Sequence, residues 1–389
     1  MHTAFRFDIR TLGVAVSAGL LAHSVLGVTI NHANGATATN AALSVMAKVG
    51  QLRWFFTHAS VGGNITTGMN VLHGTDTNRY RLTIYNYDGD NSDGAYHGGV
   101  GTEGSEGGED YRAAADPEIV TNGIVYECMR GNPDWSNKLV CFSNSVAVSG
   151  WRFPRVNVVI DKFCWIDPYA DPTNYCALIS ALESQYPETL FVYLTMPLSG
   201  LNFDENDERN SFNRHVRSFC SAHNKHLLDV ADLEAWNLSG VQQTYLSSGV
   251  TNQKMSFDYS LDTGGDWHLN AAGRRRMALG WYSLAAALFA ADRDGDGITD
   301  GDELLAGTRA ADSNSALQIR ISPASFSSSS NAVFTWTASS GRYYSVQRAT
   351  GLVNGVTWSN RLADRLGANS FTDTVEAAVQ GFYLLSVRQ

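Results

Sequence analysis

An acidic loop of twelve residues, 292–303, carries the most specific chemical pattern in the sequence. Carboxylates stand at positions one, three, five, nine and twelve of this loop, and position seven can offer its backbone carbonyl oxygen. The six candidate ligands are Asp292, Asp294, Asp296, Ile298, Asp300 and Glu303. A glycine at position six permits the sharp turn of an EF-hand-type calcium loop. The spacing predicts a structural Ca²⁺ site; the alternative is an acidic, flexible linker.

Ser60 is the candidate nucleophile. It follows the apolar run Leu52–Phe56, which is expected to form a strand, and it precedes Gly62, Gly63 and a probable helix. A serine at such a strand-to-helix turn can expose its hydroxyl above the carboxyl edge of a sheet, and the helix N-terminus stabilises developing negative charge. Because Ser-Gly turns are common, this motif alone is weak evidence of catalysis.

Asp266 and His268 share one loop before the last long helix and could supply the partners that a serine nucleophile needs. The histidine would accept the serine proton, and the carboxylate would orient the imidazole ring. The alternative is an ordinary loop before a helix, with a surface aspartate and a packed histidine. His58, two residues before Ser60, is expected to be a packing or supporting residue and not the base.

Alternating strands and helices between residues 51 and 291 must position these side chains. The apolar runs expected to form buried parallel strands are Leu52–Phe56, Val156–Ile160, Leu190–Leu194 and His226–Val230. Helical spacing predicts helices over Thr173–Tyr186, Asp204–His223 and Asn270–Ala291. The alternation predicts a three-layer α/β/α sandwich. The glycine-rich stretch Asp88–Gly108 breaks the pattern and is either a surface excursion or part of a site.

In their chain order, the serine turn and the Asp-x-His loop resemble those of the SGNH (GDSL-like) hydrolase family, over residues 50–291. The resemblance implies a flavodoxin-like parallel-sheet domain, with Ser60 as nucleophile, His268 as general base and Asp266 as the residue that orients the base. One departure is that only Trp267 separates the aspartate from the histidine, where the family usually has two residues.

A second departure concerns the oxyanion hole. The family's Gly-x-Asn-Asp block has no counterpart after the strand that ends at Ile160, where Asp161 and Lys162 follow. Lys162 is a candidate replacement for the missing donor, or else it forms a structural ion pair with Asp161. Gly99 is a candidate for the second oxyanion donor.

Composition and the first residues bear on location. The net charge is −10, and the acidic surplus is concentrated in 103–118 and 292–303, so no basic face for nucleic acid is expected. Arg6 and Arg10 precede an apolar run over 12–22, which predicts a signal peptide over 1–27; an uncleaved membrane anchor is the alternative. We therefore expect a secreted, periplasmic or cell-surface protein of bacterial type, without stable membrane insertion after cleavage.

The five cysteines form no C-x-x-C pair, so a zinc site is not expected. In an oxidising compartment some could form disulfides, and Cys128 with Cys141 is the pair closest in sequence. Since five is odd, at least one thiol must be free, and Cys164 is the expected one.

The end of the chain differs from the rest. Short strands are expected over Leu317–Ile321, Val333–Thr337, Tyr343–Gln347 and Phe382–Val387, which predicts a small all-β module, most simply a sandwich. The acidic loop resembles thrombospondin type 3 and dockerin-like calcium repeats. The expected division is a signal peptide over 1–27, a hydrolase-like domain over 28–291, a calcium loop and linker over 292–312, and a β module over 313–389.

The combined interpretation is a secreted serine esterase that hydrolyses short acyl esters, such as acetyl esters on carbohydrate, through an acyl-enzyme. Its partners would be an acylated carbohydrate or another small ester, with structural Ca²⁺ and no catalytic cofactor. The alternative is a catalytically inactive binding or adhesion protein on the same scaffold, which the missing Asn block favours.

Overall fold

The computed structural model describes residues 3–8, 27–86, 122–129, 132–148, 156–202, 205–262, 267–315, 317, 319–323, 329–339, 342–349, 359–376 and 382–388. The chain divides into two compact units. One is Ser24–Arg293, and the other is Asp294–Gln389 together with Met1–His23. The division falls inside the segment 292–312 that was predicted as calcium loop and linker.

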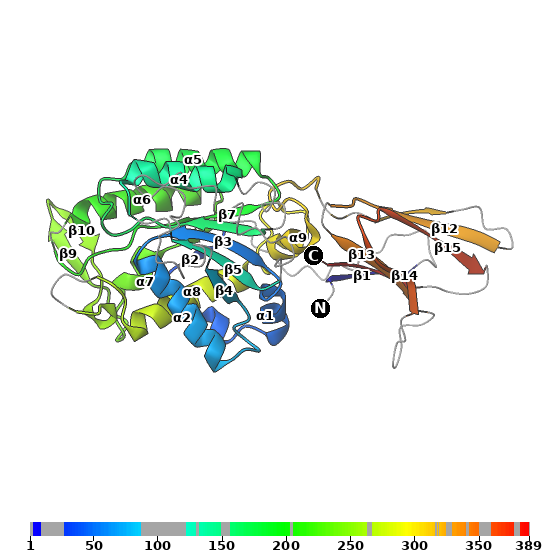
Figure 1. Ribbon diagram of the computed structural model, residues 1–389, viewed down its shortest axis with the longest axis horizontal. Coiled ribbons are helices and arrows are strands. Elements are labelled where there is room, and N and C mark those ends of the chain that lie inside the picture. Colours follow the sequence, from blue (N-terminus) through cyan, green and yellow to red (C-terminus); the bar gives the residue numbers. More distant parts are fainter. Residues whose placement is uncertain are drawn as a thin grey trace, which may run out of the picture. The chain divides into compact units, whose positions relative to one another are not determined.

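The larger unit is built on a seven-stranded sheet in the order β2-β8-β7-β6-β3-β5-β4, and every paired strand is parallel (Figure 1). Its strands are β2 (Thr29–Ile30), β3 (Arg53–His58), β4 (Thr83–Asn86), β5 (Ile124–Met129), β6 (Val158–Asp161), β7 (Leu190–Leu194) and β8 (Leu227–Leu228). The strand β3 lies between β5 and β6. At this point the sheet changes direction, because β4 and β5 lie on one side of β3, and β6, β7 and β8 lie on the other. In open parallel sheets, ligands bind beyond the carboxyl ends of the strands at this switch point.

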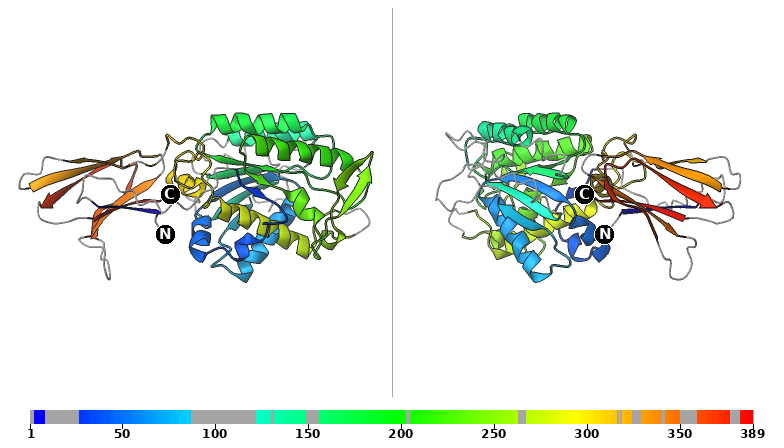
Figure 2. Two further views of the ribbon diagram at one scale, coloured as in Figure 1. Left: turned by 180° about the vertical axis from the view of Figure 1, so that it is seen from behind. Right: turned by 45° about the vertical axis from the view of Figure 1, so that its right-hand side comes forward.

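Helices cover both faces of this sheet (Figures 1 and 2). One layer holds α1 (Leu43–Val49), α2 (Val61–Thr75) and α8 (Ala271–Ala287), and the other holds α4 (Trp135–Val148), α5 (Pro172–Gln185) and α6 (Asn206–Ala222). The side chains of β3 show why. Trp54 and Phe56 each pack with their ring centroids 5.0 Å from Trp281 of α8. Phe55, which alternates with them, belongs to the core on the opposite side with Tyr175. The predicted three-layer α/β/α fold is confirmed.

The long, strongly patterned elements were predicted best. The helices expected over Thr173–Tyr186, Asp204–His223 and Asn270–Ala291 correspond to α5, α6 and α8, and Asp171 caps α5 by accepting hydrogen bonds from the Thr173 and Asn174 amides. The run His226–Val230 is a strand only over Leu227–Leu228, because Val230 begins the helix α7 (Val230–Ala235).

Several elements of the larger unit, in addition to α7, were not predicted. They are β2, β4, β5, α1, α4, the 3₁₀ helices η1 (Thr37–Thr39) and η5 (Phe257–Tyr259), and the hairpin of β9 (Thr244–Ser247) and β10 (Val250–Gln253). The glycine-rich stretch Asp88–Gly108 lies outside the described residues.

The smaller unit contains two antiparallel sheets, β1-β16-β13-β14 and β11-β12-β15. Its strands are β1 (Thr3–Asp8), β11 (Ile319–Pro323), β12 (Ser329–Trp336), β13 (Tyr343–Ala349), β14 (Ser359–Leu366), β15 (Ser370–Glu376) and β16 (Phe382–Arg388). Phe334 from one sheet packs on Tyr383 from the other with 4.5 Å between ring centroids, in a core that both sheets share. These contacts fit the predicted sandwich. The strand β1 lies within the predicted signal peptide, so cleavage would make β16 an edge strand.

All five cysteines are buried and none is in a disulfide, so a Cys128–Cys141 pairing is wrong, whereas the expectation that Cys164 stays a thiol is confirmed. Cys128 lies on β5 and Cys141 on α4, and both fill the same apolar core as small hydrophobic residues. Burial also raises the pKa of the Cys176 thiol to about 12, which keeps that thiol protonated and unreactive.

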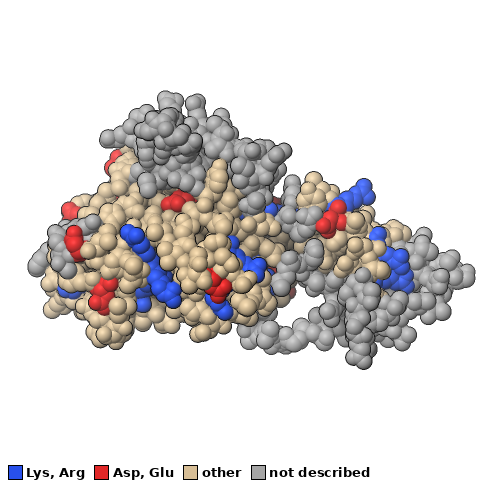
Figure 3. Space-filling view, turned by 60° about the horizontal axis from the view of Figure 1, so that its bottom comes forward, with Lys and Arg blue, Asp and Glu red and all other residues tan. Residues whose placement is uncertain are grey.

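On the face shown in Figure 3, the described Lys and Arg side chains are scattered among Asp and Glu side chains. None of the helices in the described part of the chain has the length and apolar character needed to cross a membrane.

Candidate active site

Ser60 lies at the N-cap of α2, directly beyond the carboxyl end of β3. Its backbone has φ 53° and ψ −107°, which is close to the first central position of a type II′ turn, where glycine is normally required. The Gly62 amide donates to the Ala59 carbonyl and the Gly63 amide donates to the Ser60 carbonyl, so the chain turns sharply from strand to helix. A non-glycine residue in such a region costs about 1–3 kcal/mol, and strain of this kind concentrates at functional sites.

His268 meets this serine although the two residues are 208 positions apart. The Ser60 Oγ and the His268 Nε2 form a short hydrogen bond, which is the pairing expected of a nucleophile and its base. The His268 carbonyl accepts from the Leu261 amide at 2.9 Å, and the Asn64 side chain accepts from the Leu269 amide at 2.8 Å. The histidine loop is therefore tied directly to the helix that begins at the serine.

Two further predicted site residues, Asp266 and Gly99, lie outside the described residues. Their roles as orienter of His268 and as oxyanion donor stay predictions.

Lys162 and Asp161 are both fully buried at the end of β6. The Asp161 carboxylate accepts a hydrogen bond from the Thr57 hydroxyl at 2.7 Å, and the Lys162 Nζ donates to the Phe163 carbonyl at 2.9 Å. The first contact ties the end of β6 to the neighbouring strand β3. Both predicted roles of Lys162, as an oxyanion donor and as an ion-pair partner of Asp161, stay predictions.

Glu234 of α7 is a buried acid near this lysine that the sequence reasoning missed. Burial raises its pKa to about 7. The hydrogen bond from the Leu198 amide and the positive charges of Lys162 and Arg209 lower the pKa, but burial outweighs them. Its Oε2 accepts from the Leu198 amide at 2.8 Å, and its own carbonyl accepts from the Ser256 amide. Glu234 therefore joins the loop after β7 to the segment that leads into η5.

Asn206 and Arg209 of α6, which were also missed, hold neighbouring loops. The Asn206 side chain accepts from the Ser199 amide and donates to the Ser199 carbonyl, and the Arg209 Nε donates to the Trp165 carbonyl. A signal was present, because Arg209 and Asn213 continue at helical spacing the buried stripe that contains Val216. Polar residues on the buried side of an amphipathic helix need partners in the fold.

An aromatic surface lies next to His268. The fully buried Trp267 packs against the backbone of Gly200, where an added Cβ would come within 2.4 Å of the indole. Phe257 stacks on Trp267 with 6.1 Å between ring centroids and is 47% exposed. The exposed Phe257 ring, backed by the buried Trp267 ring, presents an apolar face near the histidine loop.

The acidic loop also has the features of a metal site. Ligand oxygens of Asp292, Asp294 and Asp296 lie within 4.8 Å of one another, and the Ile298 amide donates to the Asp296 carboxylate at 2.8 Å. Gly297, at position six, has φ 93°, a conformation that its lack of a side chain permits. After the turn, Asp300 and Glu303 belong to the helix α9 (Asp300–Ala306), which was not predicted.

Glu303 supplies an independent sign of a cation site. It is fully buried, its Oε1 accepts from the Thr308 hydroxyl, and its Oε2 has no hydrogen-bond partner. Burial and the charges of Asp294, Asp296 and Asp300 raise its pKa to about 8. A buried carboxylate oxygen that faces other carboxylates without a donor fits a bound Ca²⁺, which takes oxygen ligands.

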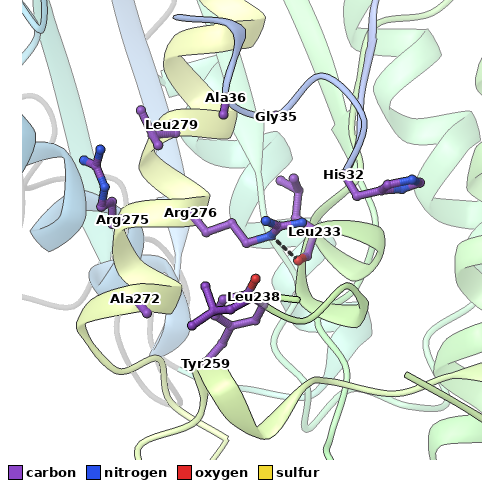
Figure 4. A pocket seen from close by; sticks show the side chains of 10 residues that line it. All are labelled: His32, Gly35, Ala36, Leu233, Leu238, Tyr259, Ala272, Arg275, Arg276 and Leu279. Atoms are coloured by element: carbon purple, nitrogen blue, oxygen red, sulfur yellow. Dashed lines mark hydrogen bonds between the residues drawn. The ribbon is translucent and has the colours of Figure 1, made fainter. Parts of the chain in front are cut away.

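A cavity of about 210 Å³ lies elsewhere in the larger unit, beside α8, and neither Ser60 nor His268 lines it. Figure 4 shows Arg275 and Arg276 leaving the helix in different directions, and the Arg276 Nε donates to the Leu233 carbonyl.

Comparisons with known proteins give only distant structural likenesses. No family model and no curated protein matches the chain. An acetyl xylan esterase from Geobacillus stearothermophilus has 14% identity and a TM-score of 0.33, and the match covers 61% of this chain and 96% of that one. A protein titled as a putative platelet activating factor from Streptococcus pneumonia has 12% identity and a TM-score of 0.31, with 63% and 92% covered. The assignment of the architecture rests on the parallel sheet of this chain and not on these likenesses.

Proposed function

We propose that the chain is a serine ester hydrolase of the SGNH type. The observation that carries this proposal is the hydrogen bond between Ser60 and His268, made at the carboxyl edge of a parallel sheet by a serine in a strained turn. A strained turn that holds a serine hydroxyl against an imidazole nitrogen is the arrangement of an activated nucleophile. A structural serine would not require this backbone conformation.

The chemistry follows from the two side chains. Ser60 Oγ attacks the ester carbonyl while His268 Nε2 takes its proton, and the alcohol leaves with that proton. The acyl-enzyme is then hydrolysed by a water molecule that His268 deprotonates, which releases the acid and restores the serine. The N-terminus of α2 and the Ser60 amide favour the oxyanion, and Gly99 or Lys162 would add a donor. Asp266 would orient the imidazole.

The substrate class is proposed from the surroundings of the pair. The exposed ring of Phe257, backed by the buried Trp267, suits the apolar face of a sugar ring. We propose short acyl esters, such as acetyl groups on carbohydrate, as substrates. The predicted signal peptide supports export. Its cleavage can be tested by expressing the protein in a secreting host and measuring the mass of its N-terminal peptide.

The test combines labelling with turnover. The full chain should be labelled by a serine-directed phosphonate at Ser60, as peptide mass mapping would show, and it should hydrolyse members of a panel of aryl and sugar acetates. Ser60→Ala should lose both properties, and the matched control Ser239→Ala, an exposed serine in another loop, should keep both. Wild-type protein that is neither labelled nor active would refute the proposal and favour a non-catalytic binding protein.

We propose further that Ca²⁺ is a structural ion of the loop 292–303. Asp292, Asp294, Asp296, Asp300, Glu303 and the Ile298 carbonyl would hold it, and the ion would supply positive charge to this acidic cluster. The Glu303 Oε2 without a donor is the supporting observation. Calorimetry should show Ca²⁺ binding that Asp296→Ala with Glu303→Ala abolishes and that Asp312→Ala, an acid outside the loop, retains. No binding at millimolar Ca²⁺ would leave an acidic linker.

A further inference from the structure

A buried hydrogen-bonded pair of side chains lies next to the serine turn. His58, the last residue of β3, is fully buried, and its Nε2 lies 2.8 Å from the Glu127 Oε1 on the neighbouring strand β5. The Glu127 side chain is 14% exposed. Because a carboxylate can only accept, the imidazole Nε2–H is the donor. This contact ties the strand that leads into Ser60 to the strand beside it.

The same carboxylate reaches the helix that follows the serine. Thr66 of α2 is almost fully buried, and its hydroxyl donates to the Glu127 Oε1 at 2.8 Å. Gly62, in the first turn of this helix, lies against the His58 ring, where an added Cβ would come within 2.3 Å of the imidazole Cγ. Glycine is therefore required for the helix to begin so close to the ring. The Glu127 carboxylate thus joins the residues on both sides of Ser60.

The charge state of Glu127 agrees with this geometry. Burial raises its pKa, but the hydrogen bond and positive charge from His58 and the hydrogen bond from Thr66 outweigh burial, so that the pKa lies below its ordinary value. An ionised carboxylate with charged and neutral donors makes stronger hydrogen bonds than a neutral group.

The position of this pair explains why a strained turn persists. Ser60 at φ 53° would relax toward an ordinary conformation unless the chain on both sides of it were held. His58 holds the strand side, Thr66 holds the helix side, and Glu127 binds both. The serine hydroxyl is thereby kept where His268 can accept its proton.

We propose that His58, Glu127 and Thr66 form a clamp of positioning residues that holds Ser60 in its reactive conformation. The clamp does not touch substrate; it acts through the turn. This inference rests on the proposed serine hydrolase function. It predicts loss of turnover with little loss of substrate binding, because the substrate-facing surface is made by other residues.

The experiment compares matched substitutions in the full chain. Glu127→Ala removes both hydrogen bonds, whereas Glu127→Gln keeps an acceptor without the charge. Thr66→Val replaces the hydroxyl by a methyl group, whereas Thr66→Ser keeps the hydroxyl. His73→Asn is the control, since His73 lies in the last turn of the same helix and bonds to the Tyr80 carbonyl. The readouts are kcat and KM on an aryl acetate per titrated active site, the rate constant of phosphonate labelling, and the melting temperature.

Glu127→Ala should lower kcat by about 10²-fold, the loss expected for a misplaced reacting group, with KM within about twofold and a parallel fall in labelling rate. Glu127→Gln should lose less than Glu127→Ala, and Thr66→Ser less than Thr66→Val. His73→Asn should change the melting temperature without changing kcat. If Glu127→Ala does not fold, the comparison of kcat and labelling rate between Thr66→Val and Thr66→Ser tests the clamp.

Two results would overturn the inference, and they are distinguishable. Clamp variants that melt earlier but keep wild-type kcat and labelling rate, while wild type is active, would show a structural pair and overturn the clamp alone. A wild-type protein with neither labelling nor turnover would overturn the proposed function and the clamp with it.

Discussion

The strain at Ser60 can be measured by replacing this residue in two ways. Ser60→Ala and Ser60→Gly both remove the nucleophile, so both should be inactive. They differ in the backbone, because alanine must adopt φ 53° with a Cβ whereas glycine adopts it freely. The strain costs about 1–3 kcal/mol. A glycine variant loses about 0.4–1 kcal/mol of unfolding free energy relative to an alanine variant, because its unfolded chain has greater entropy. The difference leaves Ser60→Gly more stable than Ser60→Ala by about 1 kcal/mol or somewhat more.

The neighbouring residue supplies the control. Ala59 is buried and is not among the described residues with positive φ, so Ala59→Gly should lose about 1 kcal/mol or more from chain entropy and from the buried methyl group. Free energies of unfolding would come from urea denaturation followed by near-ultraviolet circular dichroism. If Ser60→Gly is destabilised relative to Ser60→Ala by as much as Ala59→Gly is relative to wild type, then Ser60 is not strained and the reasoning fails.

Three further outcomes are expected. If Lys162 is an oxyanion donor, Lys162→Ala should lower turnover per titrated site by about 10²-fold, whereas a purely structural lysine would lower the melting temperature and spare turnover. Burial raises the Glu234 pKa to about 7, so the unfolded chain ionises first as pH rises past about 4.5 and the folded state loses stability up to about pH 7. Between pH 4.5 and 8, wild type should therefore lose about 3 kcal/mol of unfolding free energy relative to Glu234→Gln; a difference that does not change with pH would contradict this. Protease nicking within 292–312 should rise in chelator and fall with Ca²⁺ but not Mg²⁺, and it should become independent of Ca²⁺ in Asp296→Ala with Glu303→Ala; nicking unaffected by chelator would contradict a calcium loop.

The fold class could be predicted because local patterns were strong. The apolar runs at Leu52–Phe56 and Leu190–Leu194 read as buried parallel strands, and both are strands in the central part of the sheet. The helix over 172–185 carried its own cap in Asp171. The edge strand β2 is two residues long, which is too short for any periodic signal. The strand β8 is equally short, and the apolar run that predicted it extended beyond its true bounds. Strand order could not be predicted either, since it depends on contacts between distant segments.

The candidate site divides in the same way. The sequence alone determined which residues have the chemistry, because a serine before glycines, a histidine before a helix and carboxylates at calcium-loop spacing are local facts. Only the tertiary structure decided that Ser60 meets His268 across 208 residues, and that Ser60 takes the backbone conformation of a glycine. It also placed His58 against Glu127 and left Glu303 buried beside three other acids. The physical reason is that burial, strain and charge pairing arise between segments distant in sequence, so they exist only once the sheet and its two helical layers have formed.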